Sequence, residues 1–141
     1  MTDLETAVNN LAGHTICLCK DGSCIYSEKR GIAPIMNLIA DGVDLNGYSV
    51  ADKVVGKAAA MLFVGCGVKQ VFAKTLSLNG KIVLERFGIP YSYETLAKNI
   101  INRDGTDICP MEKTVLNIED IEEGYSALKS KLKLMGLQNK R

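Results

Sequence analysis

The stretch that decides the fold is SVADKVVGKAAAMLFVGCG, residues 49–67. Ser49 suits the N-cap of a helix and Asp52 its third position, while small and apolar residues continue up to two glycines that suit a helix end. We therefore expect one helix across these residues. It is the most informative element that the sequence offers.

The residues after this helix predict a strand and a second helix. The segment 68–75, VKQVFAKT, is short, apolar and β-branched enough for a central strand. The segment 76–88 is amphipathic, although Gly80 weakens it as a helix. Its expected inward-facing residues are Leu78, Ile82 and Phe87. Pro90 then begins an extended piece over 90–95.

The beginning of the chain predicts a helix followed by a hairpin. Thr2 and Glu5 stand in capping-box positions, and apolar residues recur at helical spacing up to Gly13. In residues 14–29, two apolar stretches flank Asp21-Gly22, a dipeptide suited to a tight turn with positive backbone dihedrals. A two-residue loop pairs Lys20 with Ser23.

The same register brings three cysteines together. Cys19 lies opposite Cys24, and Cys17 is diagonal to Cys24 on the same face of the hairpin. The cluster could be a soft-metal site or a redox pair, but buried cysteine often behaves as a small hydrophobe, and we favour packing. His14, the one histidine, lies at the far end of the strand, so no metal is assigned.

The remaining segments follow familiar turn and helix signals. A short helix with Pro34 in its first turn leads into the loop 41–47, and Asp104-Gly105 centres a later turn. A final helix ends at Gly136 and residues 137–141 form a disordered tail. The apolar face of this helix is expected to contain Ile118, Ile121, Tyr125, Leu128, Leu132 and Met135.

Composition limits the class of protein. A chain of 141 residues with 47% hydrophobic content suits a single domain, taken as residues 1–136. The formal charge of +1 and the lack of a basic face make nucleic acid an unexpected partner. Without a signal peptide or a long apolar run, we expect a soluble cytoplasmic protein with no membrane partner, whose five cysteines are thiols. The element order predicts a mixed sheet with helices on both faces, an α/β/α sandwich.

Two longer stretches carry a resemblance to a known family. DKVVGKAAAMLFVGCGVKQVFAKTLS and IINRDGTDICPMEK, with the order of the elements, resemble the small bacterial family of uncharacterised proteins catalogued as domain of unknown function 1893. The similarity extends over nearly the whole chain from the hairpin onward. It implies a cytidine-deaminase-like fold and no established reaction.

Zinc deaminases of that fold need a histidine and a glutamate at one helix start and a P-C-x-x-C pair at another. Here the first helix opens with Val50, Ala51 and Asp52, and no cysteine occurs in residues 75–79. Alignment on Pro110 instead places Met111 and Thr114 at the cysteine positions. We therefore expect neither zinc-dependent deamination nor any cofactor.

The Cys109-Pro110 pair indicates a helix start. Asp107 or Cys109 leads in, Pro110 suits the first helical position, and Glu112 lies in the electropositive first turn. A thiol at a helix N-terminus could also be a nucleophile or redox sensor, so a thiol-dependent enzyme using Cys109 is one alternative. No base is evident beside it. Asp52 is a second candidate catalytic residue.

The favoured function is binding of a small anionic, nucleotide-like ligand at the helix that starts near Ser49. Lys53 and Lys57 would share one face near the N-terminus, where cations are disfavoured unless an anion binds. The candidate ligand-binding residues are Ser49, Asp52, Lys53, Lys57, Arg103, Cys109 and Glu112. Alternatively the lysines extend into solvent or are neutralised by Asp44, Asp52 or Glu112. A third possibility is a non-catalytic module that forms homo-oligomers through its last helix.

Overall fold

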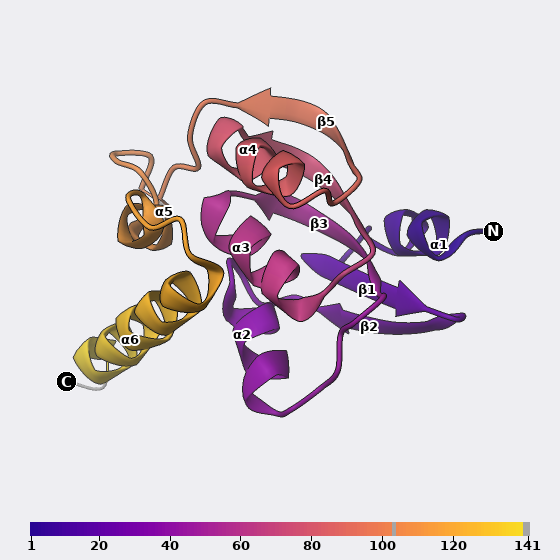
Figure 1. The fold of residues 1–141 in the computed structure, drawn as a ribbon, viewed down its shortest axis with the longest axis horizontal. Helices are drawn as coiled ribbons and strands as arrows, with labels where there is room; N and C mark the ends of the chain where they lie inside the picture. The colour runs from indigo at the N-terminus through magenta and orange to yellow at the C-terminus, as the bar shows by residue number, and fades with distance from the viewer. Residues whose placement is uncertain (103, 140–141) are drawn as a thin grey trace.

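A five-stranded mixed sheet forms the centre of the computed structural model, which describes residues 1–102 and 104–139 (Figure 1). The strand order is β2-β1-β3-β4-β5. The hairpin strands and β3 pair antiparallel, whereas β3, β4 and β5 run parallel. The bounds are β1 Ile16–Lys20, β2 Ser23–Ser27, β3 Ser49–Val55, β4 Gln70–Ser77 and β5 Tyr91–Ala97.

Helices cover both faces of this sheet, as the sequence predicts. One face packs Cys17, Cys19 and Ala51 against the first helix, and the opposite face forms the larger core, around Leu18 and Val50, with the other helices. The helices are α1 Asp3–Asn9, α2 Ala33–Ala40, α3 Lys57–Cys66, α4 Leu78–Arg86, α5 Pro110–Val115 and α6 Ile121–Asn139. The expected α/β sandwich is confirmed.

The main correction concerns residues 49–55, which form strand β3 rather than the start of a helix. Val50 and Ala51 are fully buried on opposite faces of the sheet, between β1 and β4. Branched side chains at Val50 and its neighbours suit this central position. The helix begins only after Gly56, where an alanine-rich run follows.

The buried face of α4 also differs from the prediction. Leu78, Ile82 and Phe87, expected to face inward, are among the exposed large hydrophobic residues. Val83 and Leu84 are buried in their place. The reason is the close packing of α4 on the start of α3, which selects the face that carries Gly80.

Gly80 is required because the backbone of Gly56 lies directly against it. A Cβ at Gly80 would lie 3.0 Å from the carbonyl carbon and oxygen of Gly56, and backbone cannot move aside as a flexible side chain can. We expect Gly80→Ala to lower the free energy of unfolding by about 1–3 kcal/mol. Gly136→Ala is the matched control, because its Cβ would have no atom within 4 Å and should stabilise α6 by about 0.5–1 kcal/mol. Urea denaturation measures the free energy of unfolding of both variants. Equal changes in Gly80→Ala and Gly136→Ala would contradict the close contact at Gly80.

The predictions that depend on residues close together in the sequence are confirmed. Thr2 and Glu5 form the capping box of α1, and the turn at Asp21-Gly22 has positive φ at both residues and pairs Lys20 with Ser23. Pro34 lies in the first turn of α2.

Two features at the end of the chain complete the comparison. Gly136 does not end α6, which continues to Asn139, because a glycine weakens a helix without having to stop it. The last two residues of the expected tail, 140 and 141, lie outside the described part of the chain.

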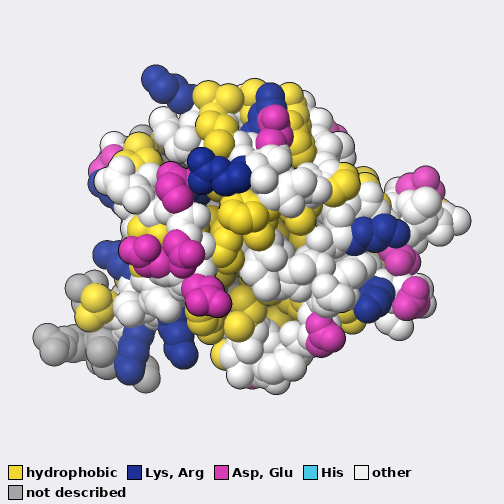
Figure 2. All heavy atoms as spheres, in the orientation of Figure 1, with side chains coloured by type: hydrophobic (Ala, Val, Ile, Leu, Met, Phe, Trp, Pro, Cys, Tyr) yellow, Lys and Arg dark blue, Asp and Glu magenta, His cyan; other side chains and the backbone are white. Residues whose placement is uncertain are grey.

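The surface mixes side-chain types. On the face shown in Figure 2, lysine and arginine side chains are interspersed with acidic and hydrophobic ones. None of the helices described between residues 1 and 139 combines the length and the apolar character needed to cross a membrane.

Candidate functional site

The candidate site lies where two parallel strands lead into helices. β3 ends at Val55 and is followed at once by α3, and β4 ends at Ser77 and is followed at once by α4. Because β3 and β4 are parallel neighbours, both helix N-termini lie at the same edge of the sheet. In open α/β sheets, ligands bind outside the carboxyl ends of the strands.

The N-terminus of α3 is occupied by a carboxylate of the chain itself. Glu112, from the start of α5, accepts hydrogen bonds from the backbone N–H of Lys57 at 2.7 Å and of Ala58 at 2.8 Å. A Cβ at Gly56 would lie 2.2 Å from Oε1 of Glu112, so glycine leaves the room for this approach. Burial raises the pKa of the Glu112 carboxyl, while the two backbone hydrogen bonds and the charge of Lys57 lower it. The helix does attract an anion, but this anion is internal.

The N-terminus of α4 has a conventional cap. The Ser77 hydroxyl accepts from the backbone N–H of Gly80 at 3.0 Å. Asn79 lies in the same first turn and lines a small hollow beside it. The same hollow is lined by Lys57 at the start of α3, so it lies beside both helix starts.

Lys57 is the central charged residue of the site. Its side chain is 6% exposed, and its ammonium group donates to the carbonyl of Leu116 at 3.1 Å and to Glu119 at 3.3 Å. The other oxygen of Glu119 accepts from Arg86 at 2.7 Å. One carboxylate thus bridges two cations, which lower its pKa through hydrogen bonds and charge, the bond from Lys57 first.

These residues surround a pocket of about 150 Å³. It runs along α4 and is closed on the other side by the loop between α5 and α6. Its lining residues are Lys57, Asn79, Ile82, Val83, Arg86, Leu116 and Glu119. Whole small-molecule sites usually measure about 300–1,000 Å³, so this pocket suits one phosphate or carboxylate group.

A larger hollow of about 650 Å³ lies between α2, α3 and α6. Its walls include Met61, Leu62 and Tyr125, and its charged lining residues, Asp44 and Glu122, are both acidic. Acidic walls disfavour an anion. The small pocket is lined by two cationic side chains, Lys57 and Arg86, and one carboxylate, Glu119, and is therefore the better candidate for an anion site.

Several expected site residues do not reach this pocket. Lys53 is exposed on β3 and does not share a helix face with Lys57, so that prediction is wrong. Ser49 begins β3, at the end of the strand opposite to α3, and its hydroxyl accepts from Gln70 at 3.0 Å rather than capping a helix. Arg103 lies outside the described residues.

Asp52 is buried within the sheet instead of standing at a helix start. It pairs with Ile16 and Ala73 on the neighbouring strands and is 7% exposed. Burial raises the pKa of its carboxyl to about 8, opposed by hydrogen bonds from the backbone of Val54 and Lys53. Among the described residues, no salt bridge reaches it. It does not line the small pocket.

Cys109 does take the N-cap position of α5, with Pro110 following, as the sequence predicts. Its side chain makes no capping hydrogen bond. The one histidine of the chain, His14, lies in the hairpin region, where its Nδ1 is 2.9 Å from Oε1 of Glu28 and its ring is tilted against that of Tyr26. Cys109 therefore has no histidine beside it that could act as its base.

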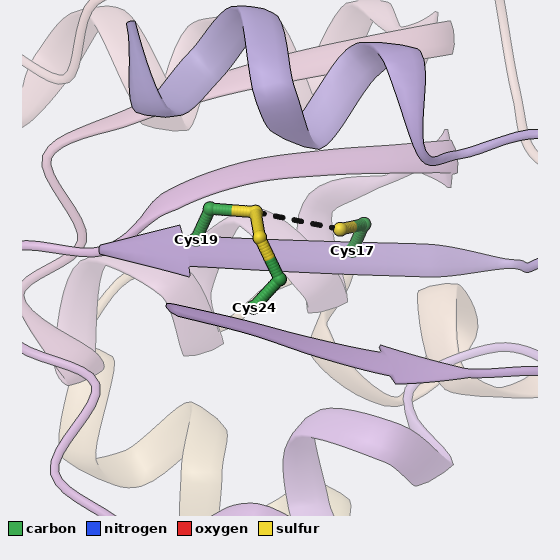
Figure 3. A group of neighbouring side chains, drawn as sticks. All are labelled: Cys17, Cys19 and Cys24. Atoms are coloured by element: carbon green, nitrogen blue, oxygen red, sulfur yellow. Dashed lines mark hydrogen bonds between the residues drawn. A yellow bond between two sulfur atoms is a disulfide. The ribbon is translucent and has the colours of Figure 1, made fainter. Parts of the chain in front are cut away.

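The hairpin cysteines require a second correction. Cys19 and Cys24 are joined by a disulfide, so the expectation of five thiols is wrong for this pair (Figure 3). The free cysteines are Cys17, Cys66 and Cys109, and burial raises the pKa of the first two. Two cysteines directly opposite each other are close enough to bond whenever an oxidant is present.

The positions compared with the zinc ligands of deaminases also change. Because residues 50–52 belong to strand β3, the helix after that strand, α3, opens with Gly56, Lys57 and Ala58. The helix after β4, α4, opens with Ser77, Leu78 and Asn79. These residues include no histidine, cysteine or glutamate.

Sequence reasoning missed Glu119, Arg86 and Asn79. Glu119 lies 62 residues from Lys57 along the chain, so no short-range pattern joins them. Glu119 also stands in a run of acidic residues that looks like an ordinary solvated surface. Only the packing of the α5–α6 loop against α4 brings the three together.

Comparisons with known proteins bear on the family and the fold of the chain. A crystal structure of a DUF1893 family protein (TM1506) from Thermotoga maritima superposes with a TM-score of 0.85 and 28% identity, covering 93% of this chain and 91% of that one. The crystal structure of a dCMP deaminase from the cyanophage S-TIM5, in apo form, gives a TM-score of 0.45 and 14% identity. This match covers 64% of the present chain and 92% of the deaminase chain. No curated protein matches the sequence. The family model described as Domain of unknown function (DUF1893) matches residues 7–132, and the chain belongs to this family.

Proposed function

We propose that this protein binds a small anionic ligand through a phosphate or carboxylate group seated between Lys57 and Arg86. The observation that carries the proposal is a buried ammonium group on the wall of a pocket, whose carboxylate partner, Glu119, is 59% exposed at the rim. An exposed carboxylate can move into solvent at little cost to itself, and an incoming anion would take its place beside the buried ammonium group.

The contacts of the Glu119 carboxylate support this binding mode. Its oxygens accept from Lys57 at 3.3 Å and from Arg86 at 2.7 Å, as two oxygens of a phosphate could. Arginine and lysine are the usual cationic partners of phosphate and carboxylate. Glu119 would act as an internal competitor that leaves when the ligand binds.

The pocket volume limits what else the ligand contains. About 150 Å³ encloses one anionic group, so the rest of a nucleotide-like ligand would lie over the exposed apolar surface of Ile82 and Leu116. A ligand of this kind is consistent with the cytoplasmic location that the sequence favours, which we retain in the proposal.

Thermal unfolding at constant ionic strength tests the proposal. With phosphate at about ten times its dissociation constant, mass action should add about 1.4 kcal/mol, or about 3–6 °C, relative to chloride. Arg86→Ala should remove most of this difference. Lys53→Ala removes the same charge from an exposed position on β3 and should leave the difference unchanged. If phosphate and chloride act alike on the parent protein, or if Arg86→Ala keeps the full difference, the pocket does not bind anions.

A further inference from the structure

The hairpin holds a second group of side chains that the anion pocket does not use. The Sγ atoms of Cys17, Cys19 and Cys24 all lie within 4.8 Å of one another, and those of Cys17 and Cys19 are 3.6 Å apart (Figure 3). Cys17 and Cys19 come from β1 and Cys24 from β2. Their convergence follows from the register, which sets Cys19 opposite Cys24 and leaves Cys17 two residues away on the same face.

The surroundings of this cluster are apolar and closed by α1. Cys17 and Cys19 are fully buried, with Ala7 and Leu11 of α1 packed against them. Cys24 is only half-buried, so the cluster has one side near solvent. Three cysteine sulfurs are therefore the potential metal ligands of this cluster.

We propose that reduction of the Cys19–Cys24 disulfide converts this cluster into a site for one thiophilic d¹⁰ cation, held by three cysteine sulfurs. A dithiol reductant supplies two electrons and two protons, becomes a disulfide itself, and leaves two cysteine thiols. The cation then displaces one proton from each of the three thiols and forms three metal–sulfur bonds. Within the hairpin cluster of the oxidised protein, Cys17 is the one cysteine that keeps a thiol, so three sulfur ligands are not available.

The geometry is close to what such a cation requires. Metal–sulfur bonds of about 2.3 Å place the sulfurs of a trigonal or tetrahedral site about 3.8–4.0 Å apart. The Cys17–Cys19 sulfur separation of 3.6 Å is already close to this value, whereas the sulfurs of Cys19 and Cys24 are bonded and must move apart by side-chain rotation once the disulfide is reduced.

The ligand type favours a soft d¹⁰ cation, and the charge of the three thiolates favours a divalent one. Three thiolates carry a charge of –3, which an apolar setting does not tolerate, and a divalent ion reduces it to –1. Thiolate ligands select Zn²⁺-like and Cu⁺-like ions over Mg²⁺ and Ca²⁺. The half-buried side at Cys24 would leave a fourth coordination position for water or an exchange partner.

The direct test is titration of the full chain with Cd²⁺, used as a spectroscopic probe, after reduction and under anaerobic conditions. The reduced protein should bind one equivalent with a sulfur-to-metal charge-transfer band, and the oxidised protein should not. Cys17→Ala and Cys24→Ser should each weaken binding by at least about tenfold. The double variant Cys66→Ala, Cys109→Ala removes two thiols outside the cluster and should bind as the parent does. Equal binding by oxidised and reduced protein, or loss of binding only in this double variant, would overturn the proposal.

Alkylation of the unsubstituted protein keeps the test valid if a core variant fails to fold. With one equivalent of Cd²⁺, Cys17, Cys19 and Cys24 should be protected from a maleimide, while Cys66 and Cys109 react at an unchanged rate, as peptide mass spectrometry would show. Unprotected hairpin cysteines would mean that the three sulfurs only pack together.

Discussion

Glu112→Ala is expected to lower the free energy of unfolding by about 3–5 kcal/mol, the largest loss among the substitutions considered. The substitution removes the acceptor of two backbone N–H groups, those of Lys57 and Ala58, at 2.7 and 2.8 Å. Both belong to the first turn of α3, whose residues from Lys57 to Phe63 are all buried. Water cannot easily replace the lost carboxylate there.

Urea denaturation of three variants would separate this capping role from a simple change of charge. Glu112→Gln keeps one acceptor oxygen and should lose about 1–3 kcal/mol. Glu94→Ala removes the same charge from the exposed strand β5 and should stay within about 0.5 kcal/mol of the parent. A loss below about 1 kcal/mol for Glu112→Ala would show that α3 does not depend on this cap.

Asp52→Asn is expected to stabilise the protein at neutral and mildly alkaline pH. Burial raises the pKa of Asp52 from 3.8 to about 8, so between these values the unfolded chain has lost a proton that the folded protein keeps. Stability therefore falls as pH rises through this window, by up to about 1.4 kcal/mol per pH unit, and levels off above it. The accumulated penalty at neutral pH is on the order of a few kcal/mol.

The comparison of pH profiles isolates this carboxyl. Asparagine has nearly the same shape and cannot ionise, so the gap in unfolding free energy between Asp52→Asn and the parent should widen from pH 5 to pH 8. Glu112, whose pKa burial also raises, contributes equally to both proteins and cancels in the difference. Parallel profiles would show that Asp52 is already ionised in the folded protein.

The sequence predicts well those elements whose cause is local. The capping box at Thr2 and Glu5 and the turn at Asp21-Gly22 each depend on residues within a few positions of one another. Both are confirmed, together with the cysteine register that follows from the turn. The packing of helices on both faces of the sheet follows from the order of such elements.

Residues 49–55 have a local pattern that suits two structures. A serine followed by an aspartate and apolar residues resembles a helix start, but three valines also suit a buried strand. The choice is made by β1 and β4, which lie on either side of this segment and supply its hydrogen-bond partners. Such partners are distant in sequence, so periodicity alone does not reveal them.

The candidate site was predictable only in part for the same reason. The sequence predicts Lys57 near a helix start that attracts an anion. It offers Glu112 only as one of three carboxylates that could neutralise the lysines, because the 55 residues between Glu112 and Lys57 leave no short-range pattern. Glu119 and Arg86 depend in turn on how the α5–α6 loop packs on α4, which has no short-range signature.

Calorimetric titration of phosphate into Glu119→Gln tests the proposed anion site most directly. The variant keeps the shape of the rim but removes the competing charge between Lys57 and Arg86, so phosphate should bind at least about tenfold more tightly than to the parent. Adding Arg86→Ala to the variant should abolish the gain. Binding that is unchanged in Glu119→Gln, or equally strong after Arg86 is removed, would contradict an anion site at this pocket.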